Sequence, residues 1–143
     1  MANANTIVQE VEAAYQAYID VFNHEDAAGF IAAYCHPHTM LSGEQGLILI
    51  NKQEDHLRFY QRTMTTLRER GWQRSGIDRL QIWPFADSLA QLVADITRYK
   101  TDGAILEQGR YCYMLRRDGT AWKILALAEI TAPFSGPGIA RVT

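Results

Sequence analysis

The sequence is poor in the residues that mark specialised classes of protein. Its only two cysteines, Cys35 and Cys112, form no CxxC motif, so we expect small buried thiols rather than a disulfide or a metal site. No apolar run approaches the roughly 18–20 residues of a membrane-spanning helix, and the run at 47–50 is only as long as a strand. The N-terminus has no basic region followed by an apolar core, so we expect no secretory signal, no membrane partner and a cytoplasmic protein.

Charge of one sign is not in excess either. The chain has 14 basic and 16 acidic residues and a net charge of −2, which gives no basic field and excludes nucleic acid as an expected partner. A length of 143 residues with 48% hydrophobic residues suits one compact domain with its own core. We expect that domain to span 1–132, followed by a tail containing Pro and Gly at 133–143.

The first half of the chain has helical periodicity. Asp26 is expected to cap a short second helix that Pro37 ends, and Asn51 to cap a third helix, with Glu54 completing a capping box. Short extended segments at 39–42 and 47–50 lie between these two helices. The apolar stripes of the two longer helices are Ile7, Val11, Ala14, Tyr18 and Phe22 in the first, and Leu57, Tyr60, Met64 and Leu67 in the third.

From Trp72 onward the period changes to two, which predicts strands near 73–84, 88–101, 105–117 and 120–131. Asp-Gly at 102–103 and at 118–119 favours two-residue turns. These turns would place Tyr113 opposite both Leu92 and Ile124. One sheet face is then almost wholly apolar and must be covered, most simply by the three helices. Its expected members are Ala90, Leu92, Ala94, Ile96, Tyr111, Tyr113, Leu115, Trp122, Ile124, Ala126 and Ala128.

The opposite sheet face has a mixed composition that is typical of a protein–protein interface, so we expect a homodimer formed through it. The same register places Asp95 opposite Arg110, and Arg98 opposite Glu107. The first pair is interpreted as an ion pair on the outer face, with a polar dyad in a pocket as the alternative if a bulge occurs at Gly109. The second pair is expected at the solvent-facing end of the sheet. The outer face would comprise Gln91, Val93, Asp95, Thr97, Gln108, Arg110, Cys112, Met114, Leu125, Leu127 and Glu129.

Two segments, AYIDVFNHEDAAGFIAAYCHPHTML and GRYCYMLRRDGTAWKILALAEI, together with the order of elements, resemble the nuclear transport factor 2-like superfamily. The resemblance covers roughly residues 6–132 and is strongest to the SnoaL-like and ketosteroid-isomerase-like branch. It implies an α+β cone, in which a strongly curved, mostly antiparallel sheet wraps around three helices from the N-terminal half. It also implies a cavity between helices and sheet, and frequent dimerisation through the outer sheet face. Members include isomerases, dehydratases, cyclases and non-catalytic binders, so the fold does not settle the activity.

The isomerase branch uses a tyrosine on the first helix, an aspartate base after the second helix and an aspartate on a late inner strand. Matching on Asn23 and Asp26 carries these positions to Tyr18, Ser42 and Tyr111. The carboxylate base is therefore missing, and a serine hydroxyl without an activating base does not abstract a proton from carbon at neutral pH. The isomerase mechanism itself is not expected.

The tripeptide His36-Pro37-His38 offers the remaining candidate chemistry. A metal site is not expected, because the other histidines, His24 and His56, lie on separate elements. His38 would point into the cavity if Ser42 does, and its ordinary pKa suits a general acid or base. The alternative is a surface or capping histidine. The predicted catalytic residues are His38, Tyr18 and Tyr111, and the predicted ligand-binding residues are Tyr15, Met40, Ser42, Tyr60, Tyr113 and Trp122.

These residues predict binding of a small apolar or aromatic molecule without a cofactor. If the protein is an enzyme, we expect proton transfer of the isomerase, dehydratase or cyclase type. The alternative is a non-catalytic dimeric binding or interaction module with a filled cavity.

Overall fold

The computed structural model describes residues 3–24, 27–43 and 46–131, which form three helices and six strands. The predicted tail at 133–143 and the predicted cap at Asp26 lie outside these residues. Within the described ranges, no helix has both the length and the apolar character needed to cross a membrane. The elements are α1 (Ala4–Asn23), α2 (Ala27–Tyr34), β1 (Cys35–Gly43), β2 (Gly46–Ile50), α3 (Gln53–Glu69), β3 (Trp72–Ala86), β4 (Leu89–Lys100), β5 (Ile105–Asp118) and β6 (Ala121–Ile130).

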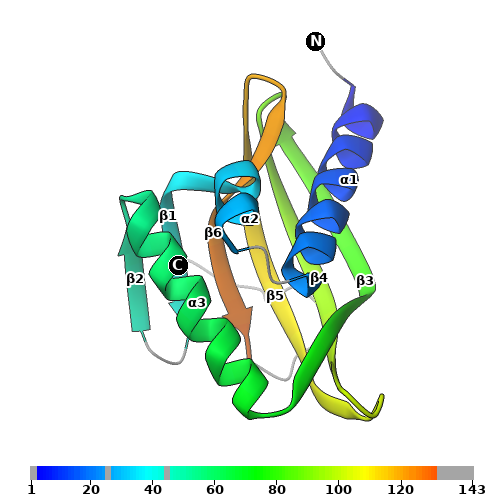
Figure 1. Cartoon of the computed structure of the whole chain (residues 1–143). Helices are drawn as coiled ribbons and strands as arrows, with labels where there is room; N and C mark the ends of the chain where they lie inside the picture. Colours follow the sequence, from blue (N-terminus) through cyan, green and yellow to red (C-terminus); the bar gives the residue numbers. More distant parts are fainter. Residues whose placement is uncertain (1–2, 25–26, 44–45, 132–143) are drawn as a thin grey trace, which may run out of the picture.

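The strands form one open sheet in the order β2-β1-β6-β5-β4-β3. Only the β1–β6 pairing is parallel; the other four are antiparallel. The sheet curves around the helices, which all lie on one of its faces (Figure 1). This arrangement confirms the predicted α+β fold class.

The two long helices form where the apolar period predicted them. In α1 the buried side chains form one stripe, and Asn3 caps the helix by accepting a hydrogen bond from the Thr6 backbone N–H at 2.9 Å. The predicted capping box of α3 is wrong, because Lys52 occupies the N-cap without a side-chain bond. The Oδ1 atom of Asn51 instead accepts a hydrogen bond from Nδ1 of His38 at 3.2 Å.

The predicted register between β4 and β5 is confirmed. Ile96 faces Gly109 without a bulge at that glycine. The connecting loop, however, has three residues rather than two, because the backbone N–H of Lys100 bonds to the Ala104 carbonyl at 2.8 Å. Gly103 takes the left-handed conformation that this longer loop requires, with φ +86°. A register shift after Arg98 absorbs the extra residue.

The turn between β5 and β6 also differs from the prediction. Asp118 faces Ala121, so the two-residue loop is 119–120 rather than 118–119. The loop takes its glycine, Gly119 (φ +64°), at its first position. The two strands are therefore displaced by two residues relative to the predicted register, which keeps each side chain near the turn on its expected face.

A bulge in β6 then reverses the faces of its second half. Leu115 pairs with Ile124, whereas Met114 pairs with Ala126, so Leu125 is an extra residue on β6. Beyond this bulge every side chain of β6 points to the face opposite to the predicted one. The affected residues are Ala126 and Ala128, which join the outer face, and Leu127 and Glu129, which join the helix-covered face.

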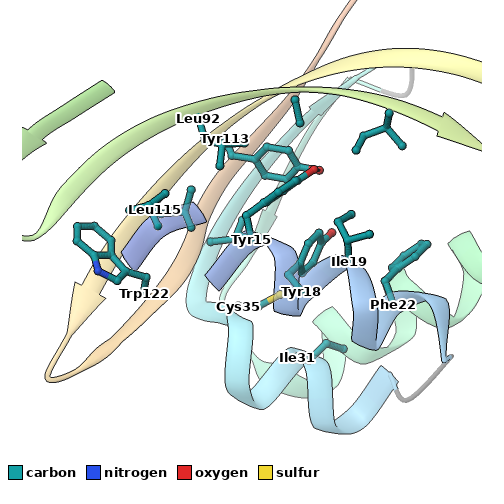
Figure 2. Packing of buried hydrophobic residues seen from close by; sticks show 14 of the residues in the cluster. Tyr15, Tyr18, Ile19, Phe22, Ile31, Cys35, Leu92, Tyr113, Leu115 and Trp122 are labelled. Atoms are coloured by element: carbon teal, nitrogen blue, oxygen red, sulfur yellow. The ribbon is translucent and has the colours of Figure 1, made fainter. Parts of the chain in front are cut away.

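The core between the helices and the sheet contains hydrogen-bonded tyrosines. Tyr15 donates a hydrogen bond to the Tyr113 hydroxyl oxygen at 3.1 Å, and the two rings meet edge-on (Figure 2). The hydroxyl oxygens of Tyr18 and Tyr60 lie 3.3 Å apart. Each buried hydroxyl thus meets another, which avoids the cost of an unpaired polar group in the core. Both cysteines are free thiols; Cys35 is buried as expected, whereas Cys112 on β5 is only half-buried.

Candidate functional site

A cavity of about 460 Å³ lies between α3, the β1–β2 hairpin and strands β4–β6. The described residues that line it come from α3, the residue after α3 and the sheet, and none of them belongs to α1 or α2. The walls divide into two kinds of side chain. The apolar part comprises Leu41, Ile48, Phe59, Leu67 and Leu127, and the charged and phenolic part comprises Arg62, Arg70, Arg98, Glu107, Tyr111 and Glu129.

Glu107 on β5 is the centre of an ion-pair network in the cavity wall. Arg70, the residue after α3, donates two hydrogen bonds to its carboxylate, at 3.1 and 2.9 Å. Arg98 on β4 donates a third from Nη1 at 2.9 Å. The hydrogen bonds from Arg70 and the positive charge of both arginines lower the pKa of Glu107 despite its partial burial. Glu107 therefore holds the two arginines in place as a carboxylate.

Tyr111 on β5 is fixed by the same arginine. Nη1 of Arg98 donates a hydrogen bond to the phenol oxygen at 2.6 Å. The ring lies against Gly109 on its own strand, since a Cβ built there would lie 2.7 Å from the Tyr111 Oη atom. Because the phenol oxygen accepts from Arg98, its own O–H proton is directed to another acceptor.

Glu129 on β6 faces Tyr111 across the β5–β6 pair. The bulge at Leu125 places it on the cavity face. Its side chain leans toward β1, because a Cβ built on Gly43 would lie 3.9 Å from Glu129 Oε2. Tyr111 leans the other way, toward Arg98 on β4, so the carboxylate and the phenol occupy opposite sides of the cavity.

Two of the residues predicted from the sequence, Tyr111 and Ser42, lie at this cavity. Ser42 borders it from the exposed end of β1, where it pairs with Ala128 of the outer face. Four other tyrosines predicted there are packed in the core instead. Burial raises the pKa of Tyr113 to about 12 and raises the others well above their ordinary value, so all four are neutral hydroxyls. These core tyrosines are Tyr15, Tyr18, Tyr60 and Tyr113.

The remaining predicted residues lie away from the cavity. Thr39 and Leu41 take the buried positions of β1, so His38 and Met40 are exposed on the opposite face. The expectation that His38 points into the cavity is therefore wrong. Trp122 is buried and donates from Nε1 to Glu10 Oε2 at 2.9 Å.

The arginines and glutamates of the cavity were missed by sequence reasoning. Arg98 and Glu107 do pair as predicted, but in the cavity wall rather than at a solvent-facing sheet end. The sequence did hold a sign that Glu129 faces the cavity. The predicted register turned the bulky Leu127 outward and placed alanines on the core face, and a bulge in β6 removes this mismatch. Among the described residues, no group of three or more His, Cys, Asp or Glu side chains could hold a metal ion.

The chain resembles known proteins both in sequence and in fold. A family model described as "NTF2-like protein (DUF6841)" matches residues 9–131. No curated protein sequence matches the chain. Similar solved structures include a protein with a cystatin-like fold from Nostoc punctiforme, with a TM-score of 0.74 and 12% identity over 93% of this chain and 96% of that one.

Two further solved structures come from Streptomyces. The protein Aln2 from a Streptomyces species has a TM-score of 0.70 and 16% identity over 90% of this chain and 93% of its own. A candidate dehydratase of the NTF2-like family from Streptomyces avermitilis has a TM-score of 0.69 and 13% identity, over 90% and 99% of the two chains. At such identities the likeness concerns the fold alone. The family match over most of the sequence shows that the chain belongs to the NTF2-like family DUF6841.

Proposed function

We propose that the protein binds a small, largely apolar or aromatic molecule in the cavity beneath α3. The observation that carries this proposal is a cavity of about 460 Å³ with one apolar wall and one hydrogen-bonding wall. Ligand pockets in proteins usually measure about 300–1,000 Å³ and combine apolar walls with a few fixed polar groups. The ion pairs of Glu107 hold the polar wall in one arrangement before a ligand arrives.

Proton transfer of the isomerase, dehydratase or cyclase type is the chemistry that this site supports best. Of the predicted catalytic residues, Tyr111 remains as the donor that would orient a carbonyl group. Glu129 supplies the carboxylate that the isomerase comparison lacked at Ser42, and it replaces His38 as the candidate acid or base. The fold shared with a candidate dehydratase supports this choice of reaction class.

Binding in the cavity is tested by thermal shift across steroid-like, phenolic and polyketide-like compounds. Leu127→Trp fills the cavity from the sheet side, and Ile105→Trp, on an exposed strand end, serves as the matched control. Compounds should raise the Tm of the wild type and of Ile105→Trp but not of Leu127→Trp. The absence of any stabilising compound, or equal shifts in all three proteins, would contradict cavity binding.

The second proposal is a homodimer formed through the outer sheet face. A row of paired residues crosses all six strands on this face, and three of its side chains are large, apolar and 43–65% exposed. Exposed apolar side chains of this size on one sheet face are typical of an interface rather than of a solvated surface. The row runs Leu49, Met40, Ala126, Met114, Gln91 and Trp83.

Sedimentation velocity at micromolar concentration tests the dimer. The wild type should sediment with twice the chain mass. Met40→Glu, which places a charge in the row between Leu49 and Ala126, should sediment as a monomer. A monomeric wild type would remove the proposal. A dimer that binds none of the compounds above would favour the alternative, a non-catalytic interaction module.

A further inference from the structure

The cavity has two separate polar ends, and their chemistry restricts the ligand. Resting on the proposed function, we infer that the ligand is a hydroxy-substituted aromatic carboxylate. Its carboxylate would lie at Arg98 and Tyr111, and its hydroxyl at Glu129. The aromatic body would pack against the apolar wall between these two ends.

The Arg98 end has more hydrogen-bond donors than acceptors. Arg98 makes both of its hydrogen bonds, to Glu107 and to Tyr111, through Nη1. Its Nε atom is buried and has no partner within the part of the chain that the structure describes. The Tyr111 oxygen already accepts from Arg98, so its O–H is available as a donor. This end therefore suits a group that only accepts hydrogen bonds.

The charge of the cavity favours an anion as that acceptor. Three guanidinium groups and two carboxylates line it, which leaves one positive charge in excess. Glu107 is occupied by Arg70 and Arg98, whereas Arg62 forms no ion pair with any described residue. A carboxylate binds guanidinium through charge-assisted hydrogen bonds, which are stronger than those of a neutral carbonyl.

The Glu129 end has the opposite preference. Its carboxylate has no hydrogen bond or ion pair with another described residue and can only accept. A hydroxyl on the ligand meets this need and leaves the ligand with a single negative charge, which neutralises the cavity. An ammonium group in place of this hydroxyl would make the ligand a zwitterion of zero net charge, and the cavity would keep its excess positive charge.

The spacing of the two ends fits a bicyclic ring system. Arg98 lies on β4 and Glu129 on β6, with β5 between them. Neighbouring strands lie about 4.8 Å apart, so these two strands are roughly 10 Å apart. A ligand with polar groups roughly 8–10 Å apart therefore touches both ends.

Isothermal titration with 6-hydroxy-2-naphthoate, 2-naphthoate and 2-naphthol tests the inference. The wild type should bind 6-hydroxy-2-naphthoate about tenfold more tightly than either compound with one polar group, since each lost charge-assisted bond costs about a factor of ten or more. Tyr111→Phe should remove most of the advantage of 6-hydroxy-2-naphthoate over 2-naphthol. Glu129→Gln should reduce its advantage over 2-naphthoate.

Glu12→Gln, on the exposed surface of α1, is the matched control and should bind all three compounds as the wild type does. Circular dichroism and melting curves establish that each variant is folded before titration. In the contrary outcome, the three compounds bind with equal affinity, which Tyr111→Phe and Glu129→Gln leave unchanged and Leu127→Trp abolishes. This result would overturn the two-ended ligand while leaving cavity binding intact. Binding of none of the three by the folded wild type overturns the two-ended ligand as well. If the broader compound panel also fails, the proposed function fails with it.

Discussion

His56 on α3 gives a quantitative prediction for stability against pH. Its side chain is 1% exposed, and its ring stacks on Tyr60 with 5.1 Å between the centroids. The Nε2 atom is buried and has no hydrogen-bond partner among residues of the described ranges. This burial lowers the pKa of His56 from 6.5 to about 4, because a charged imidazole would lose its hydration there.

The lowered pKa makes folding less favourable in acid. Between pH 6.5 and pH 4 the unfolded chain binds a proton at His56 that the folded chain does not, so the free energy of unfolding falls as the pH falls through this window. Below the folded pKa both states are protonated and this contribution becomes constant. A difference of about 2.5 pKa units corresponds to about 3 kcal/mol.

Replacing His56 by phenylalanine should abolish this contribution while keeping a ring on Tyr60. Urea unfolding at pH 7, 6, 5 and 4 measures it: the wild type should lose about 3 kcal/mol more than His56→Phe between pH 7 and pH 4. His38→Gln, which removes an exposed histidine, controls for the general effect of losing a histidine. Identical pH profiles for wild type and His56→Phe would refute the argument.

Three further predictions concern buried or partly buried hydrogen bonds and one close approach. Tyr15→Phe and Tyr113→Phe should each lower the free energy of unfolding, measured by urea, by about 1 kcal/mol. The double variant should lose less than the sum of the two single losses, because both substitutions remove the same hydrogen bond. Additive losses would contradict this. Asn23→Ala should lower the free energy of unfolding by about 1–3 kcal/mol in the same assay. The Asn23 side chain donates to the Ser75 carbonyl at 2.9 Å and accepts from the Ser75 N–H at 2.7 Å, and both bonds would be lost. A loss under about 0.5 kcal/mol would contradict this prediction. Gly109→Ala should displace the Tyr111 hydroxyl and weaken 6-hydroxy-2-naphthoate binding as much as Tyr111→Phe does, whereas wild-type affinity would show that Tyr111 needs no space there.

The fold could be predicted from the sequence because its signals are local. The apolar stripe of α1 and the Asp-Gly turns depend on neighbours in the chain, and each led to the correct element. The pairing of Arg98 with Glu107 followed from the same register. Local rules, however, predict only which strand residues pair. They do not predict whether Arg98 and Glu107 line a cavity or face solvent.

The composition of the cavity depends on contacts that no local pattern encodes. The bulge at Leu125 decides the orientation of Glu129, and its trace in the sequence is indirect: simple alternation would turn the bulky Leu127 outward. The core tyrosines were expected to line a pocket, but whether Tyr15 meets a ligand or Tyr113 depends on how closely α1 approaches the sheet. Asn51 shows the same limit, because its cap competed with a histidine 13 residues earlier.

The extra residue at Leu125 means that strand length, and not only side-chain identity, sets the chemistry of the cavity. Deleting this one residue would restore simple alternation along β6, turning the acid of Glu129 outward and presenting an alanine methyl in its place. A single-codon deletion would thus remove one of the two carboxylates that line the cavity without substituting any amino acid. When chains of this family are aligned, a gap in the last strand therefore carries the same weight as a changed catalytic residue.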